Sequence, residues 1–230
     1  MISFENISFS VAGRTLVKNS TVSIPNGHKV GLVGKNGTGK TSLFRLIYGE
    51  ITLDQGNLKL SKNAQIGGVS QEAPGNSVTL LDTVLASDRE RVDLLQKAEE
   101  EKDPLKIAEI QTRLVDIDAW SAEARASTIL NGLGFDKHKQ RLACSEFSGG
   151  WRMRVALAAV LFSKPDLLLL DEPSNYLDLE GTIWLQAYIS KYPSTIILIS
   201  HDRSLLNNSV NSILHLEDKE LHLYLSLIHI

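Results

Sequence analysis

The chain has 230 residues, of which 43% are hydrophobic and 22% are charged, with a formal net charge of −3. This length and apolar content are enough to bury a real core, as one large α/β domain or two small ones. The small net charge carries no global signal for nucleic acid or an anionic membrane, and no apolar run approaches the 18 residues of a membrane span. Without a signal-peptide pattern, and with a single cysteine, the chain is expected to be cytoplasmic.

The first third of the chain predicts short strands around a glycine-rich loop. Residues 2–11 alternate apolar and polar side chains, which predicts an antiparallel strand at an edge or in a hairpin. Residues 16–24 predict a second strand, and the apolar run 30–33 predicts a buried one. Residues 56–69 predict further short strands.

Residues 34–41 match the phosphate-binding pattern G-x-x-x-x-G-K-[ST] at every fixed position. A predicted strand precedes them, and a predicted helix begins at Ser42, so backbone N–H groups and a helix N-terminus would surround one point. Gly37 and Gly39 would let the backbone approach a ligand closely. Lys40 would reach the β- and γ-phosphates, and the Thr41 hydroxyl would help to hold Mg²⁺. The segment predicts a nucleotide site.

From about Leu80 to Ile117, apolar residues recur at alternating steps of three and four, which predicts two antiparallel helices in a coiled-coil hairpin. Asp103 suits a helix N-cap and Pro104 suits a first helical turn, so the turn between the helices should lie just before them. Residues 88–125 hold eleven acidic and seven basic residues, a net charge of −4. A solvated helical face is therefore favoured over an RNA-binding patch. A third helix is expected after Ser121, with Ala124, Ile129, Leu130 and Leu133 as its apolar positions and Gly134 as its end.

The second half alternates helices at 151–162 and 182–189 with apolar strands at 167–170 and 195–200, which predicts a parallel sheet. Its ligand should lie at the carboxyl ends of the strands. Asp171 would end one strand, where a carboxylate can bind Mg²⁺ through water. Glu172 beside it could act as a general base on an attacking water.

Three further elements gain meaning from their order after the phosphate loop. Gln71 comes first, Ser148-Gly149-Gly150 precede a predicted helix, and His201 follows the last buried strand. Each alone is typical of a surface or loop. A glycine-led helix N-terminus can bind an anion, so the triplet could form a second anion-binding point, although such a triplet alone is more often a plain loop.

This order resembles the nucleotide-binding domain of ATP-binding cassette (ABC) proteins over residues 1–224. The segment 147–154, FSGGWRMR, resembles the ABC-F class, in which two cassettes in one soluble chain act on ribosomes. Segments 171–178 and 200–203 fit the same class, and 116–121 is similar to its YheS-like bacterial subgroup. The resemblance implies a P-loop NTPase fold with a parallel-sheet core, an antiparallel β subdomain and a helical subdomain that carries the hairpin.

The resemblance also implies domain bounds. Residues 1–78 and 151–224 would form the core with its β subdomain, and 79–150 the helical subdomain, with an arm-like hairpin at about 80–117.

The resemblance implies a role for each matching residue. Glu172 would be the catalytic base, His201 would contact the γ-phosphate, and Gln71 would link Mg²⁺ and the attacking water to the helical subdomain. Thr41, Gln71 and Asp171 would serve the metal. The residues expected to bind ATP, directly or at the interface with a facing cassette, are Gly34, Lys35, Asn36, Gly37, Thr38, Gly39, Lys40, Thr41, Ser42, Ser148, Gly149, Gly150 and Asp178. ATP and Mg²⁺ are the expected cofactors. A second cassette and the ribosome are the expected partners, and no binding to a membrane or to DNA is expected.

Two stretches depart from the pattern. Many cassettes stack an aromatic side chain on adenine, but Val11 stands there, with Phe9 two residues earlier, so neither base stacking nor strong selectivity for adenine is predicted from the sequence. Residues 225–230, LSLIHI, resemble a translated transposon adapter and are predicted to be non-native. A genuine short apolar tail is the alternative.

Two other functions stay open at this point. The cassette could energise a membrane transporter, although the WRMR signature and the hairpin favour the ABC-F class. It could also be a non-catalytic ATP-dependent clamp, against which the intact Glu172 argues.

Overall fold

The computed structural model describes residues 2–69 and 75–225, which fall into two compact units. The first unit comprises residues 1–68 and 165–230, and the second comprises residues 69–164. Predicted Gln71 and residues 226–230 lie outside the described residues. The division into a core and a helical subdomain at 79 and 150 stays a prediction.

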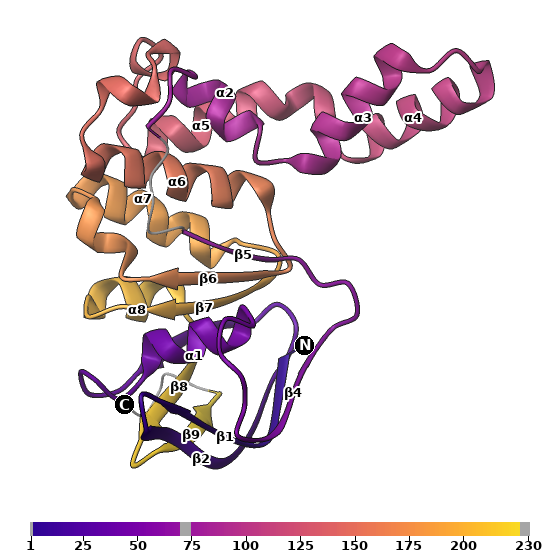
Figure 1. The fold of residues 1–230 in the computed structure, drawn as a ribbon. Helices are drawn as coiled ribbons and strands as arrows, with labels where there is room; N and C mark the ends of the chain where they lie inside the picture. The colour runs from indigo at the N-terminus through magenta and orange to yellow at the C-terminus, as the bar shows by residue number, and fades with distance from the viewer. Residues whose placement is uncertain (1, 70–74, 226–230) are drawn as a thin grey trace. The chain divides into compact units, whose positions relative to one another are not determined.

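The first unit contains two β-sheets (Figure 1). A three-stranded antiparallel sheet has the order β2 (Arg14–Ile24), β1 (Ile2–Val11) and β4 (Gln55–Leu60). A six-stranded sheet has the order β5 (Ile66–Gly68), β6 (Leu167–Asp171), β7 (Thr195–Ile199), β3 (Lys29–Val33), β8 (Ser212–Glu217) and β9 (Glu220–Tyr224). Its first five strands pair in parallel, and β9 pairs antiparallel with β8.

The central strands of the large sheet are apolar along their length because both of their faces are covered. Leu167 to Leu170 of β6 and all five residues of β7 are buried, as expected for parallel strands. Leu169 and Ile197 face the same apolar cluster as Phe4 of β1 and Leu43 of α1 (Lys40–Ile47). This shared core holds the phosphate loop between β3 and α1 at the carboxyl edge of the sheet.

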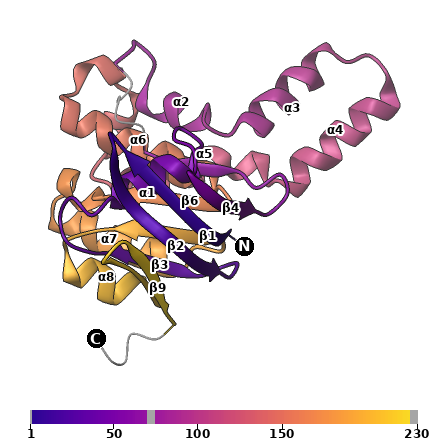
Figure 2. The same ribbon diagram turned by 60° about the horizontal axis from the view of Figure 1, so that its bottom comes forward.

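Two more helices and a contact between strands complete the first unit. The helices α7 (Leu179–Ser190) and α8 (Arg203–Ser209) contact each other, and a short 3₁₀ turn, η4 (Pro173–Tyr176), follows β6. The backbone N–H of Lys18 on β2 donates to the carbonyl of Lys219, at 2.8 Å, in the turn between β8 and β9. Figure 2 shows β9 beside β2, so the two sheets meet along these edge strands.

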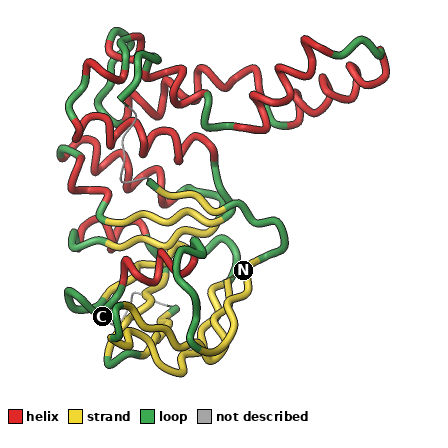
Figure 3. Tube along the Cα trace, viewed as in Figure 1, coloured by secondary structure: helices red, strands yellow, loops and turns green. Residues whose placement is uncertain are grey.

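The second unit is helical within its described residues. Its helices are α2 (Leu80–Leu85), α3 (Arg89–Glu100), α4 (Pro104–Asp116), α5 (Ala122–Gly132) and α6 (Gly149–Ser163), with 3₁₀ turns η1 (Ala119–Ser121), η2 (Lys139–Arg141) and η3 (Cys144–Glu146). Figure 3 shows α3 and α4 side by side, joined by a loop. The predicted antiparallel hairpin is therefore present.

Local caps hold the loop of this hairpin. The Asp103 carboxylate accepts the backbone N–H of Leu105 at 3.0 Å, and Pro104 occupies the first turn of α4, as the sequence predicted. One carboxylate oxygen of Glu101 accepts the N–H groups of Lys102 and Asp103 at 2.9 and 3.0 Å. The hydrogen bonds to these two N–H groups lower the pKa of Glu101. The hairpin end is thus ordered by its own polar groups.

The hairpin predicted for residues 2–11 is confirmed, because β1 pairs antiparallel with β2; β4 pairs on its other side, so β1 is the centre of its sheet. Two details of the sequence interpretation were wrong. The first hairpin helix is not continuous from Leu80, because the Ser87 hydroxyl donates to the carbonyls of Val84 and Ala159, and Asp88 then caps α3. Ala124 is exposed, and its neighbours Ala122 and Ala126 face the core instead.

Candidate nucleotide site

The phosphate loop spans residues 34–41, between the end of β3 and the first turn of α1. Gly39 stands at the N-cap position of α1 with φ 110°, where a side chain is strained. A Cβ built on Gly34 would come within 2.5 Å of the Leu216 carbonyl oxygen, and one on Gly39 within 3.0 Å of a Leu16 methyl. The loop can therefore follow this path only with glycine at both positions.

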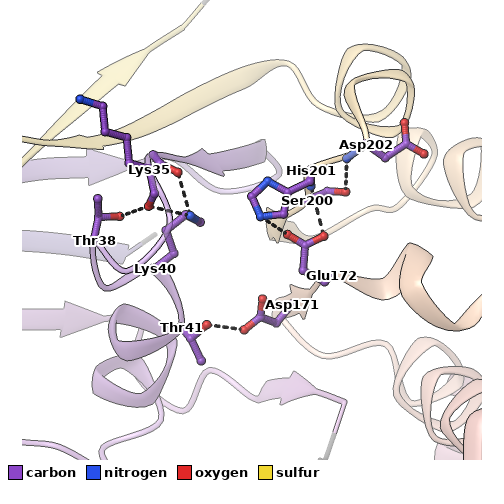
Figure 4. Close-up of polar contacts among 10 residues, drawn as sticks. Lys35, Thr38, Lys40, Thr41, Asp171, Glu172, Ser200, His201 and Asp202 are labelled. Carbon is purple, nitrogen blue, oxygen red and sulfur yellow. Dashed lines mark hydrogen bonds and ion pairs between the residues drawn. The ribbon is translucent and has the colours of Figure 1, made fainter.

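The side chain of Lys40 makes hydrogen bonds to the backbone of the loop. The Lys40 ammonium donates to the carbonyls of Gly34 and Lys35 at 2.8 and 3.1 Å, and Thr38 donates through its hydroxyl to the same Lys35 carbonyl at 2.9 Å. Figure 4 shows the Lys40 side chain turned into the loop, while the Lys35 side chain extends away from the carboxylates. An anionic phosphate makes a stronger, charge-assisted hydrogen bond than a carbonyl does. The Lys40 ammonium can therefore exchange these two carbonyls for a phosphate oxygen.

Thr41 and Asp171 bring two oxygen groups together from α1 and β6. The Thr41 hydroxyl donates to a carboxylate oxygen of Asp171 at 2.8 Å. Within the described residues, no group of three or more His, Cys, Asp or Glu side chains is arranged to hold a metal. This donor set fits Mg²⁺, which is commonly held by one or two carboxylates together with substrate phosphates and water.

Glu172 and His201 meet at the ends of β6 and β7. The backbone N–H of His201 donates to one carboxylate oxygen of Glu172 at 3.1 Å, and its Nε2 lies 3.4 Å from the other. Glu172 has φ 49°, in the left-handed region where non-glycine residues are uncommon, and its backbone N–H donates to Ile199 at 2.9 Å. Such conformations concentrate at functional sites, since the surrounding structure must hold them.

One oxygen of Glu172 has unused hydrogen-bonding capacity. Its Oε1 is buried and accepts no hydrogen bond from any described residue, although His201 lies near it. A buried carboxylate oxygen without a donor is costly, so it is a natural acceptor for a proton from a bound water. The His201 side chain is 63% exposed and is accessible to a ligand.

The loop after β7 is ordered by polar contacts that the sequence interpretation did not predict. The Ser200 hydroxyl accepts the backbone N–H of Asp202 at 3.0 Å, and the Asp202 carboxylate caps α8 by accepting the N–H groups of Ser204 and Leu205. These bonds hold His201 between two fixed neighbours. Asp202 directly before a helical segment was the one available signal, as an N-cap residue.

The expected site residues divide between the two units. Those of the first unit converge at the carboxyl ends of β3, β6 and β7: residues 34–41, Ser42, Asp171, Glu172 and His201. In the second unit, Ser148 is the N-cap of α6, and Gly149 and Gly150 open it. Asp178 belongs to the first unit and caps α7 by accepting the N–H of Gly181 at 2.9 Å.

Phe9 is fully buried in the core of the first unit, so it is unavailable to stack on a base. Val11, at the end of β1, is half-buried.

A sequence profile described as "ABC transporter" matches residues 17–175, which is more than half of the chain. The chain belongs to the ABC transporter family. Its relatives include the "Probable ATP-binding protein YheS" of Haemophilus influenzae, 43% identical over 97% of this chain and 36% of the relative. The human "ATP-binding cassette sub-family F member 3" is 41% identical over 97% of this chain and 32% of the relative. The resemblance to the ABC-F class is therefore confirmed, and the chain spans about a third of the length of these relatives.

Solved cassettes share the fold of this family member. The "Structure of ATP binding subunit of ABC transporter" superposes with a TM-score of 0.72 at 15% identity, covering 98% of this chain and 90% of that one. A dimeric post-hydrolysis cassette bound to ADP and Pi gives 0.67 at 18% identity, covering 97% and 98%. The predicted fold class, an ABC-type α/β cassette with a parallel sheet, an antiparallel subdomain and helices, is confirmed.

Proposed function

We propose that this cassette binds Mg·ATP and hydrolyses the bond between its β- and γ-phosphates. The observation that carries the proposal is the convergence of Lys40, the Thr41–Asp171 pair and the Glu172–His201 pair at one edge of one sheet. These are a cationic hydrogen-bond donor for phosphate, a candidate pair of Mg²⁺ ligands and a candidate base, the three parts that phosphoryl transfer to water requires. Membership of the ABC transporter family supports the same chemistry.

Each residue then has one task. The backbone of residues 34–41, Ser42 and Lys40 hold the β- and γ-phosphates, and Thr41 and Asp171 would hold Mg²⁺, which neutralises phosphate charge. The free Oε1 of Glu172 accepts the proton of the attacking water. His201 contacts the γ-phosphate. The role of Gln71, between metal and water, rests on the family resemblance alone.

A second cassette completes the proposed site. In the second unit, Ser148, Gly149 and Gly150 are exposed, and a Cβ on either glycine would meet nothing within 4 Å. The family resemblance gives such a segment to the γ-phosphate of a facing cassette, with Asp178 at the interface. A solved structural neighbour is itself described as dimeric, which supports pairing either in tandem or between copies.

The cellular setting that we propose is the ribosome. Relatives named as F-family members support this role. No helix in the described part of the chain is long and apolar enough to cross a membrane. The acidic hairpin α3–α4 argues against a broad grip on RNA. We therefore expect the cassette to contact the ribosome in the cytoplasm, either through a ribosomal protein or through a few basic side chains of the hairpin. Such side chains are Arg89, Arg91, Lys97, Lys102 and Lys106.

The test of the ATPase is Glu172→Gln. The variant should bind Mg·ATP with parental affinity, because shape and hydrogen bonding persist, while turnover falls roughly 10²–10⁴-fold with the loss of the base. Glu180→Gln, which removes an exposed carboxylate from the first turn of α7, is the matched control and should hydrolyse ATP at the parental rate. A parental rate in Glu172→Gln would assign the base to another group.

The test of the ribosome role is sedimentation of the Glu172→Gln chain with ribosomes, with and without ATP. ATP should increase co-sedimentation, because it favours the paired cassettes. A variant in which residues 89–116 are replaced by a short Gly-Ser turn should bind less. Equal sedimentation with and without ATP contradicts the switch, and unchanged binding without the hairpin contradicts that contact alone.

A further inference from the structure

Trp151, in the first turn of α6, lies at the centre of a cluster within the second unit. The guanidinium carbon of Arg154 lies 4.4 Å from the centroid of the indole, and the ammonium of Lys139 lies 5.2 Å from it. Phe135 meets the same ring edge-on, with centroids 5.1 Å apart. Both cations are within the range in which the face of a tryptophan attracts positive charge.

The cluster ties the start of α6 to the segment 133–139. A Gly134 Cβ would lie 3.6 Å from the Trp151 ring, and Gly134 has φ 94°, so the backbone passes close to the indole there. Arg154 also donates to the carbonyl of Leu133 at 3.3 Å. The position of Lys139 is set by Asp136, whose carboxylate accepts the N–H of Lys139 at 2.9 Å.

The segment 133–139 is itself anchored in the core of its unit. Leu133 and Phe135 are fully buried, and Phe135 makes an edge-on contact with Phe147, at 5.7 Å between centroids, just before α6. Trp151 is only half-buried and reaches from the helix to this anchored segment. The indole thus bridges a fixed part of the unit and a helix end.

That helix end lacks the usual internal cap. Among the described residues, the Ser148 hydroxyl makes no hydrogen bond to the first turn of α6, although serine at this position commonly does so. Gly149 and Gly150 contribute no side chains. No side-chain cap therefore occupies the N–H groups of this turn, and the direction in which they point is set by the direction of the helix axis.

We infer that Trp151 is a positioning residue, which fixes the direction of the open end of α6 so that it can contact a triphosphate bound to a facing cassette. The inference rests on the proposed pairing of cassettes. Trp151 acts through residues 148–150 and does not need to touch the nucleotide. Arg154 and Lys139 restrict the indole by cation–π contacts, and Phe135 supports its edge.

The experiment uses chains that carry Glu172→Gln, which should pair in ATP without hydrolysing it, and measures pairing by analytical ultracentrifugation. Adding Trp151→Ala should weaken ATP-driven pairing ~10-fold or more, because a misdirection of about 1 Å can cost 10²-fold in a positioned site. Mg·ATP affinity of the unpaired chain should stay parental, since the phosphate loop lies in the other unit. Trp151→Phe should restore most of the pairing, because it keeps an aromatic face.

Trp120→Ala is the matched control, since Trp120 is a 66% exposed tryptophan of the same unit. It should pair as the Glu172→Gln chain does. Undiminished pairing in Trp151→Ala would overturn the inference alone. Equal losses in Trp151→Ala and Trp151→Phe, or a matching loss of ATP affinity, would also overturn it. If the Glu172→Gln chain itself never pairs in ATP, the proposed second cassette fails and the inference falls with it.

Discussion

The two units support their functional groups in different ways. In the first unit, Thr41, Asp171, Glu172 and His201 stand at the ends of strands or at a helix start, and each takes part in a hydrogen bond with another of the four. In the second unit, residues 148–150 are exposed and uncapped, and their direction depends on side chains packed behind them. The first unit therefore fixes its candidate groups by hydrogen bonds between its own elements, while the second leaves the N-terminus of α6 exposed, as the proposed contact with a facing cassette requires.

The same difference extends to packing. The strands β6 and β7 are buried on both faces, whereas α3 has no buried residue and meets α4 through half-buried positions. Burial of apolar surface dominates stability, so the first unit should be the more resistant to substitution on its exposed loops and the more sensitive in its strands.

The largest effect is expected from truncating a buried leucine in the first unit. Leu198→Ala, in the centre of β7, should lower the free energy of unfolding by roughly 2–5 kcal/mol, because the side chain is fully buried and a cavity remains. Leu94→Ala, at a half-buried seam position of α3, should cost clearly less. Urea denaturation followed by circular dichroism checks this, and equal losses would contradict the contrast in packing.

The second effect is on nucleotide affinity. Lys40→Ala should weaken Mg·ATP binding by about 1.5–3 kcal/mol, because it removes a charged hydrogen bond to phosphate. The control is Lys35→Ala in the same loop, whose ammonium is turned away from the carboxylates and should matter little. Isothermal titration calorimetry measures both. A similar loss in the two variants would show that net charge, and not the position of Lys40, attracts the nucleotide.

The third effect is a loss of stability at alkaline pH, specific to the first unit. Burial raises the pKa of Tyr192, whose hydroxyl donates to the Pro165 carbonyl at 2.9 Å. The pKa of Tyr192 in the folded state lies above the unfolded value of about 10. The stability that its buried, neutral hydroxyl contributes is therefore complete below pH 10 and is lost as pH rises beyond it. Tyr192→Phe should flatten this decline, which is measured as urea midpoints at pH values from about 10 upward. An unchanged slope would assign the decline to other groups.

The smallest effects are expected from an exposed ion pair of the second unit and from removal of the last residues of the chain. Arg113→Ala breaks an exposed ion pair with Glu90 at 2.7 Å on the hairpin and should change the free energy of unfolding little, because solvent screens exposed ion pairs. Deletion of residues 225–230 should leave the melting temperature and ATP affinity unchanged, as a non-native tail would. A clear drop in melting temperature would show that these apolar residues belong to the folded protein.

Local patterns were sufficient to predict most elements and the phosphate loop. The match at 34–41, the apolar strands at 167–170 and 195–200 and the caps at Asp103 and Pro104 each depend on neighbours within a few residues. The steric demand on glycine, the burial of a parallel strand and the capping of a helix are short-range effects. The sequence by itself therefore determined the elements, the class of fold and the position of the phosphate loop.

Contacts between distant segments were decided only by the tertiary structure. The meeting of Thr41 with Asp171 and of Glu172 with His201 joins residues 130 and 29 positions apart. The break before α3 depends on a hydrogen bond from Ser87 to Ala159, 72 positions away, which a heptad pattern does not contain. The cations around Trp151 likewise come from a separate turn as well as from its own helix. Such pairings follow from the packing of whole elements, because no local propensity selects one distant partner over another.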